Sequence, residues 1–133
     1  MECDFGFICD YAEQDAKLHA VGMGWDMVYA TGVPTMHPVM TFVAKLRGSL
    51  AEAGVKDMSL RIIDADVEDV IPPVEQQINF EVKPGQLSAA ATILVNMYGL
   101  QFKKFGQYAI HLVVQGVEMK VVHFTVATPP TTG

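Results

Sequence analysis

The stretch GQYAIHLVVQGVEMKVVHFTV, residues 106–126, decides the fold class. Two runs of alternating apolar residues flank Gln115-Gly116, and a two-residue turn with glycine second is typical of a β-hairpin. Pairing Val114 with Val117 gives one face that is almost wholly apolar, as a buried sheet face should be. Phe124 falls out of phase with this face, so a bulge near Val122-His123 is predicted to return it to the core.

The same period of two recurs in shorter stretches along the chain. Residues 3–11, 17–25, 39–47, 58–64 and 76–82 each alternate apolar and polar side chains, and turn signals separate them. In residues 17–25 the bulkier face carries His19, Val21, Met23 and Trp25. The pattern predicts an all-β domain, a two-sheet antiparallel β-sandwich of the immunoglobulin or C2 type with seven to eight strands.

Residues 87–102 are ambiguous between helix and strand. Leu87, Ala90, Leu94 and similar positions fit a helical stripe, whereas β-branched Thr92, Ile93 and Val95 favour a strand. We predict a strand, because that choice agrees with the rest of the chain.

Length and composition indicate one domain with an unusually apolar surface. The 133 residues suffice for a single core, predicted over residues 1–127, with a disordered Pro- and Thr-rich tail at 128–133. Half of the residues are apolar and 18% are charged, against about 25% in typical soluble domains. We expect part of this excess to cover an interface with another copy or with a partner protein.

The charge balance argues against two classes of partner. A net charge of −6 with nine scattered basic residues does not suit nucleic acid or an anionic membrane surface. No apolar run approaches the roughly 20 residues of a membrane span, and no basic segment resembling a signal peptide opens the chain. The expected location is the cytoplasm. Cys3 and Cys9, placed on one face of a strand, would lie too far apart for a disulfide.

Two residues near the start are candidates for ligand binding, Asp10 and Trp25. Asp10 stands on an otherwise apolar strand, and Gly22-x-Gly24 before Trp25 could let a ligand approach the backbone closely. The alternatives are structural: an Asp that accepts backbone hydrogen bonds from the next turn, and a strand bend that seats Trp25 in the core.

One acidic turn is a candidate metal site. Asp64, Asp66, Glu68 and Asp69 offer several oxygens within one loop, as Ca²⁺ requires, and the first three lie on one side of an extended chain. The loop lacks the central glycine of an EF-hand and contains Pro72-Pro73. The alternative is a solvated acidic turn.

Two segments resemble a known bacterial family. They are Cys9-Asp10-Tyr11-Ala12 with residues 17–25 (KLHAVGMGW), and the ending Gly106-x-Tyr108, Gly116, Phe124-x-Val126. They are similar to a family catalogued as a domain of unknown function, and the likeness spans nearly the whole chain. Ala16 departs from the glycine usual before the Lys-Leu pair. The resemblance implies a compact β-sandwich and carries no activity.

Catalytic patterns are not apparent in the sequence. There is no Gly-x-Ser-x-Gly elbow, and the four histidines are widely separated. No cofactor is expected. We predict a non-enzymatic interaction or assembly module that forms a homo-oligomer or docks on a larger partner protein through a sheet face or an edge strand. The alternative is a small-ligand or calcium-binding sandwich that uses the acidic turn 64–69 or the Trp25 region.

Overall fold

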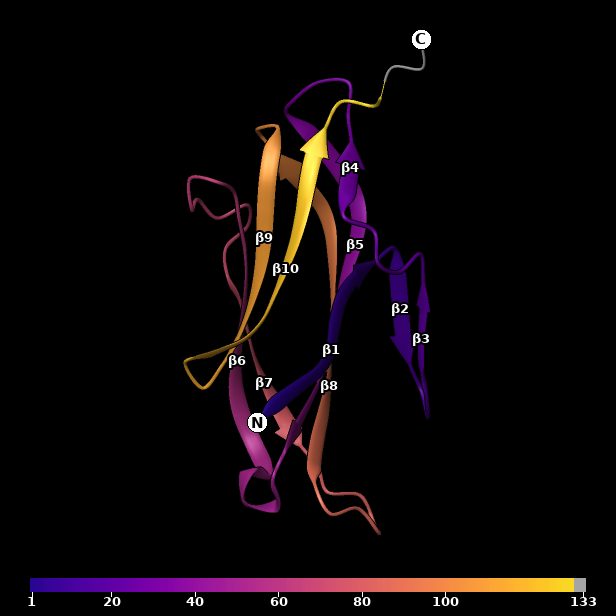
Figure 1. Ribbon diagram of the computed structural model, residues 1–133, viewed down its shortest axis with the longest axis vertical. Coiled ribbons are helices and arrows are strands. Elements are labelled where there is room, and N and C mark those ends of the chain that lie inside the picture. The colour runs from indigo at the N-terminus through magenta and orange to yellow at the C-terminus, as the bar shows by residue number, and fades with distance from the viewer. Residues whose placement is uncertain (131–133) are drawn as a thin grey trace.

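A computed structural model describes residues 1–130 of the chain. Ten strands and one short 3-10 helix, η1, follow one another along the chain (Figure 1). They are β1 (Glu2–Cys9), β2 (Tyr11–Gln14), β3 (Leu18–Val21), β4 (Met27–Tyr29), β5 (Thr35–Gly48), η1 (Leu50–Glu52), β6 (Gly54–Ile63), β7 (Val74–Phe80), β8 (Ala89–Phe102), β9 (Gly106–Val114) and β10 (Val117–Ala127). The helix is far too short to cross a membrane, and none of the described segments forms a spanning helix.

The strands form three sheets. The largest has the order β4-β10-β9-β6-β7, the second β1-β5-β8, and the third is the hairpin β2-β3. All pairs are antiparallel except β10 and β4. The all-β prediction is therefore confirmed, with ten strands instead of seven or eight.

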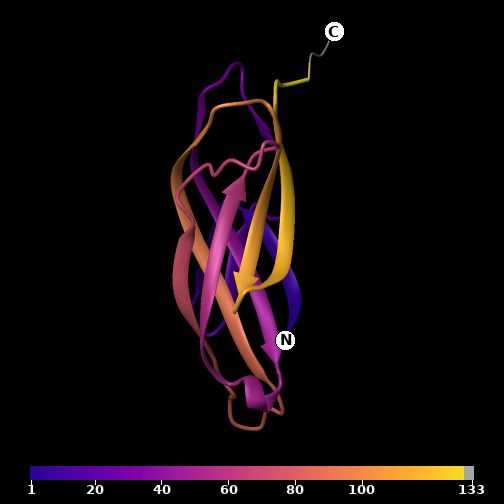
Figure 2. The ribbon, with the colours of Figure 1, turned by 90° about the vertical axis from the view of Figure 1, so that its left-hand side faces the viewer.

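The two larger sheets curl around one core. A bridge between Glu81 and Ala90 joins β7 to β8 on one side, and on the other the Lys120 stem of β10 covers Gly6 of β1. The five-stranded sheet is bent like half a barrel (Figure 2), so the layout is not clearly that of an immunoglobulin or C2 domain. The alternating residues of every long strand supply the core between the sheets.

The predicted hairpin forms β9 and β10. Gln115 and Gly116 both have positive φ, as a tight two-residue turn requires, and Val114 pairs with Val117. A bulge does return Phe124 to the core, but it lies at Met119, between Glu118 and Lys120, and not near residues 122–123.

Residues 87–102 form a strand, as predicted, over the span of β8. It pairs with β5 along its whole length, from Gly48↔Ala89 to Thr35↔Phe102. The buried side switches from odd to even residues at Gly99, which has positive φ and lies in register with Pro38 of β5. The long β5–β8 ladder bends there and keeps Leu100 inside.

One expectation about the first strand is wrong. Cys3 and Cys9 do not share a face of β1, because an extra residue at Asp4 shifts the register: Cys3 packs on the main core and Cys9 on the opposite side. His19 is exposed, because β3 covers only residues 18–21 and turns its even positions, Leu18 and Ala20, inward. His123 is also exposed.

The predicted tail begins after the last strand. Thr128 to Pro130 are exposed and belong to no sheet. Residues 131–133 of the predicted tail lie outside the described part of the chain.

Candidate interaction site

The hairpin β2-β3 lies on the outer face of the three-stranded sheet. It buries a small second core of Cys9, Ala12 and Val43, against which Phe7, Leu18, Ala20 and Leu94 pack. A sheet that bears apolar residues on both faces needs a cover on its outer face, because only the inner face packs against the main core. Figure 1 shows the hairpin standing beside β1 and β5, outside the main body.

Asp10 and Gly22 anchor the base of this hairpin. The Asp10 amide donates to the Val21 carbonyl at 3.0 Å, and the Gly24 amide donates to the Ile8 carbonyl at 3.1 Å. Gly22 has φ of +66° and lies against the Asp10 carboxylate, which a β-carbon at position 22 would overlap. Asp10 thus packs at the root of the hairpin, and the positive φ of the facing position 22 favours glycine.

An apolar groove of about 690 Å³ opens between β1 and the hairpin. Its walls are Phe5, Phe7, Leu18, His19, Ala20, Val21 and Met23. Phe5 and Phe7 stack at 5.9 Å between ring centroids, while Val21 and Met23 are 65% and 58% exposed. β3 pairs with β2 alone, so its second edge is free along this groove in the described structure. Exposed apolar groups beside a free strand edge are typical of a protein-binding surface.

Trp25 packs against the main core beside His37, with 5.5 Å between ring centroids. Trp25 Nε1 and His37 Nε2 are both buried without a hydrogen-bond partner. Burial lowers the pKa of His37, while the backbone of Val39 and the charge of Asp10 oppose this effect. Of the two predicted ligand-binding residues, Trp25 therefore packs beside a histidine that the sequence did not single out, and the charge of Asp10 acts on the same histidine.

The acidic turn encloses a lysine. Lys104 Nζ lies 2.7 Å from an Asp66 oxygen and 3.8 Å from oxygens of both Asp64 and Glu68. The three carboxylates surround one ammonium group, and a tight turn brings them there: the Val67 amide donates to the Asp64 carbonyl at 3.0 Å and Val67 has positive φ, so the chain is not extended as the spacing argument assumed. The backbone carbonyl of Lys104 accepts a hydrogen bond from the Tyr108 hydroxyl at 2.7 Å, which fixes the loop that carries Lys104.

The fourth acid of the turn is separate from this cluster. Asp69 binds Arg61 at 3.0 Å and 3.3 Å. Within residues 1–130 no group of three or more His, Cys, Asp or Glu side chains is arranged to hold a metal ion. The turn's own Asp64 instead accepts the backbone amides of Asp66 and Glu68.

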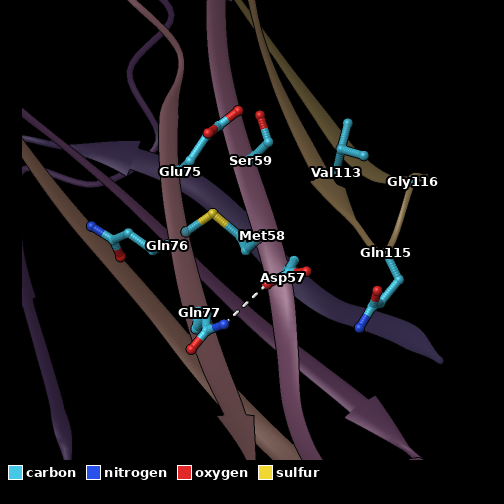
Figure 3. Close-up of a pocket in the computed structure, with 9 residues that line it drawn as sticks. All are labelled: Asp57, Met58, Ser59, Glu75, Gln76, Gln77, Val113, Gln115 and Gly116. Carbon is cyan, nitrogen blue, oxygen red and sulfur yellow. Dashed lines mark hydrogen bonds between the residues drawn. The ribbon is translucent and has the colours of Figure 1, made fainter.

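A polar hollow of about 710 Å³ lies on the outer face of the five-stranded sheet. Figure 3 shows its rows of side chains from β6, β7 and the end of β9. Asp57 accepts a hydrogen bond from Gln77 at 3.3 Å, and Glu75 and Val113 flank Ser59 in the sheet register. The acids and amides suit a solvated surface, as expected for outward positions of a half-exposed sheet.

The thiols are poorly suited to nucleophilic chemistry. Burial raises the pKa of the Cys9 thiol, and burial likewise raises the pKa of Cys3, so both stay protonated at neutral pH. Both cysteines are free. Neither sits in the apolar groove.

The sequence did not single out Phe5, Phe7 or Met23 as surface residues. Alternation predicts that Phe5 and Phe7 lie on one face of the strand with both cysteines, as a buried face would. The available signal was Ile8, a large apolar residue between Phe7 and Cys9 that alternation places on the other face. A strand with large apolar groups on both faces needs a second cover or an interface.

Comparisons with known proteins give a family and no activity. No curated protein matches the chain. Among solved structures, the chain is similar to the Pseudomonas fluorescens alkylpurine DNA glycosylase AlkC bound to DNA containing an abasic site analog. The identity is 11% and the TM-score 0.43, over 77% of this chain and 28% of that one. The chain thus spans less than a third of that protein, and so low a score carries no argument about fold or function.

The family comparison agrees with the resemblance seen in the Cys9–Trp25 and Gly106–Val126 segments. The matching model covers residues 4–127, nearly the whole chain, and is described as a family of unknown function. The chain therefore belongs to the family of unknown function DUF6941.

Proposed function

We propose that the protein is a non-enzymatic interaction module that self-associates or docks on a larger partner. The surface is the outer face of the three-stranded sheet, where the hairpin and β1 form the apolar groove. In this proposal the two larger sheets act as the layers of a sandwich-like scaffold of the immunoglobulin or C2 kind.

The exposure of the groove supports this proposal. Val21 and Met23 lie mostly in solvent beside the stacked Phe5 and Phe7. Covering such a group of apolar side chains is favourable by about 25 cal/mol per Å² of apolar surface removed from water. The free edge of β3 adds unpaired backbone groups that a second strand could satisfy.

Solution mass is the first test. We expect light scattering over a wide concentration range to give either a defined oligomer or a monomer of 14.5 kDa. In an oligomer, the double change Val21→Glu and Met23→Glu should weaken association at least tenfold, because both side chains would be buried at the contact. The matched control is Glu75→Ala with Gln77→Ala, in the polar hollow, which should leave the mass unchanged.

If the protein is a monomer, the test is whether this surface binds a partner protein. A photo-crosslinking residue at position 23 of the full chain should then give a discrete adduct in cells, and one at position 77 should not. The Val21→Glu change should remove the adduct. A monomer with equal labelling at both positions would overturn the proposal.

A second candidate is a small-ligand site at Trp25 and His37. Two buried ring nitrogens without partners favour it, because such groups cost free energy unless a ligand or water binds them. Thermal shift with a panel of anionic and polar metabolites tests it. A stabilisation that His37→Phe abolishes would support this site, and a flat response would exclude it for that panel.

A further inference from the structure

A second hollow, of about 440 Å³, continues the apolar groove. It lies between the turn of the β2-β3 hairpin, the outer face of β5 and β8, and the loop after β7. Phe5 and Leu18 line both the groove and this hollow, so the two form one continuous surface. A ligand that fills the groove therefore reaches the hollow.

Three lysines line this second hollow. Lys17 comes from the hairpin turn, Lys45 from β5 and Lys83 from the loop after β7. They are three of the nine basic residues in a chain of net charge −6. Segments remote in sequence thus bring a third of the positive side chains to one place, although acids outnumber bases along the chain.

None of the three lysines forms an ion pair within residues 1–130. Lys104 and Arg47, by contrast, bind carboxylates at 2.7 Å and 2.8 Å. The hollow contains a single acid, Glu81, which accepts a hydrogen bond from Asn79 at 3.3 Å. Clustered like charges without partners repel one another and favour an anionic ligand.

The arrangement of charge and apolar surface defines the ligand further. Phe5 of β1 and Lys45 of β5 are directly opposite each other in the sheet, so the apolar wall and the positive charge lie on neighbouring strands. A ligand that satisfies both parts needs apolar groups followed closely by carboxylates. The free edge of β3 suits an extended peptide.

We propose that the groove and the lysine hollow together bind an extended segment of another protein in which apolar residues are followed by several Asp or Glu residues. This inference rests on the proposed function and specifies its partner. A second copy of the chain is a poorer fit, since its acidic turn is already bound by Lys104 and Arg61. Electrostatic attraction would steer the acidic segment, and the apolar residues would hold it.

The test uses fluorescence anisotropy with the full chain and labelled nine-residue peptides. The probe library carries four positions drawn from Leu, Val and Phe, followed by five drawn from Asp and Glu. One control library has Lys at the acidic positions, and another has Ser at the apolar positions. We expect binding to the first library only, with affinity falling as NaCl is raised from 50 to 300 mM.

Charge-matched variants separate specific contacts from net charge. Lys17→Glu with Lys83→Glu should weaken binding of the acidic library at least tenfold. Lys56→Glu with Lys103→Glu changes the net charge equally outside the hollow and should stay within threefold of the wild type. Equal losses in both double variants would overturn the inference.

The remaining outcomes distinguish this inference from the proposed function. If Met23→Glu abolishes binding or crosslinking while the Lys17 and Lys83 variant does not, the acidic partner is wrong and the interaction surface stands. If Met23→Glu has no effect in either assay, the proposed function fails as well. Binding to phosphatidylserine vesicles in place of the peptides, lost in the Lys17 and Lys83 variant, would overturn the inference in favour of a lipid surface.

Discussion

The outer faces of the two larger sheets differ in what covers them. The five-stranded sheet has a bare polar hollow of about 710 Å³ with Asp57 and Glu75, whereas the three-stranded sheet has a hairpin and an apolar groove of about 690 Å³. The hollows are similar in size, but acids and amides predominate among the side chains of the first and apolar residues among those of the second. Volume alone therefore does not distinguish the two faces; apolar side chains, a free strand edge and lysines without ion pairs do, and these features are the basis of the proposed interaction surface.

The largest expected effect is on the hairpin that creates this difference. Gly22→Ala should destabilise the protein by about 1–3 kcal/mol, because alanine disfavours φ of +66° and the new β-carbon would displace the Asp10 carboxylate. Gly24→Ala is the matched control, since φ is +77° there but the added carbon meets nothing within 4 Å. We expect it to cost about 1 kcal/mol. Denaturant unfolding measures both, and equal losses would refute the role of the Asp10 contact.

A smaller effect is expected in how the stability of the protein depends on pH, through His37. Burial lowers the pKa of His37 in the folded state below its ordinary value of 6.5, so the unfolded chain binds the proton more readily. The free energy of unfolding should therefore be highest above pH 6.5 and decline as pH falls below it. His37→Gln should remove this part of the acid sensitivity, whereas Met36→Gln, an exposed neighbour, should not. Thermal melts between pH 5 and 8 check the expectation.

The smallest effect belongs to the acidic turn beyond β6. The hydrogen bond and charge of Lys104 lower the pKa of Asp66 below 3.8, so this pair stabilises the fold at neutral pH and loses that contribution as pH falls through the lowered value. Lys104→Ala should raise the pKa of Asp66 in an NMR titration, while Lys103→Ala should leave it unchanged.

The same Lys104 variant tests whether the acidic turn can bind calcium. Lys104 occupies the position between Asp64, Asp66 and Glu68 that a cation would take, so millimolar Ca²⁺ should not shift the melting temperature of the wild-type protein measurably. Lys104→Ala should allow weak binding, seen as a small upward shift. A clear shift in the wild type would instead support the calcium-binding alternative.

The sequence alone determined what depends on local periodicity. The all-β class and the β9–β10 turn with the Val114–Val117 pair follow from alternation and from the turn preference of Gly116. Residues 87–102 were ambiguous on their own, and the strand was predicted because the rest of the chain indicated an all-β domain.

Tertiary structure decided everything that depends on register shifts and on distant segments. One extra residue at Asp4 reversed which face of β1 bears Phe5, and alternation cannot reveal where a bulge falls. Lys17, Lys45 and Lys83 are scattered in the sequence and meet only because the hairpin folds onto β5 and β8. Charge and exposure at a site are sums over neighbours in space, so only the folded arrangement could turn three isolated lysines and a pair of phenylalanines into one surface.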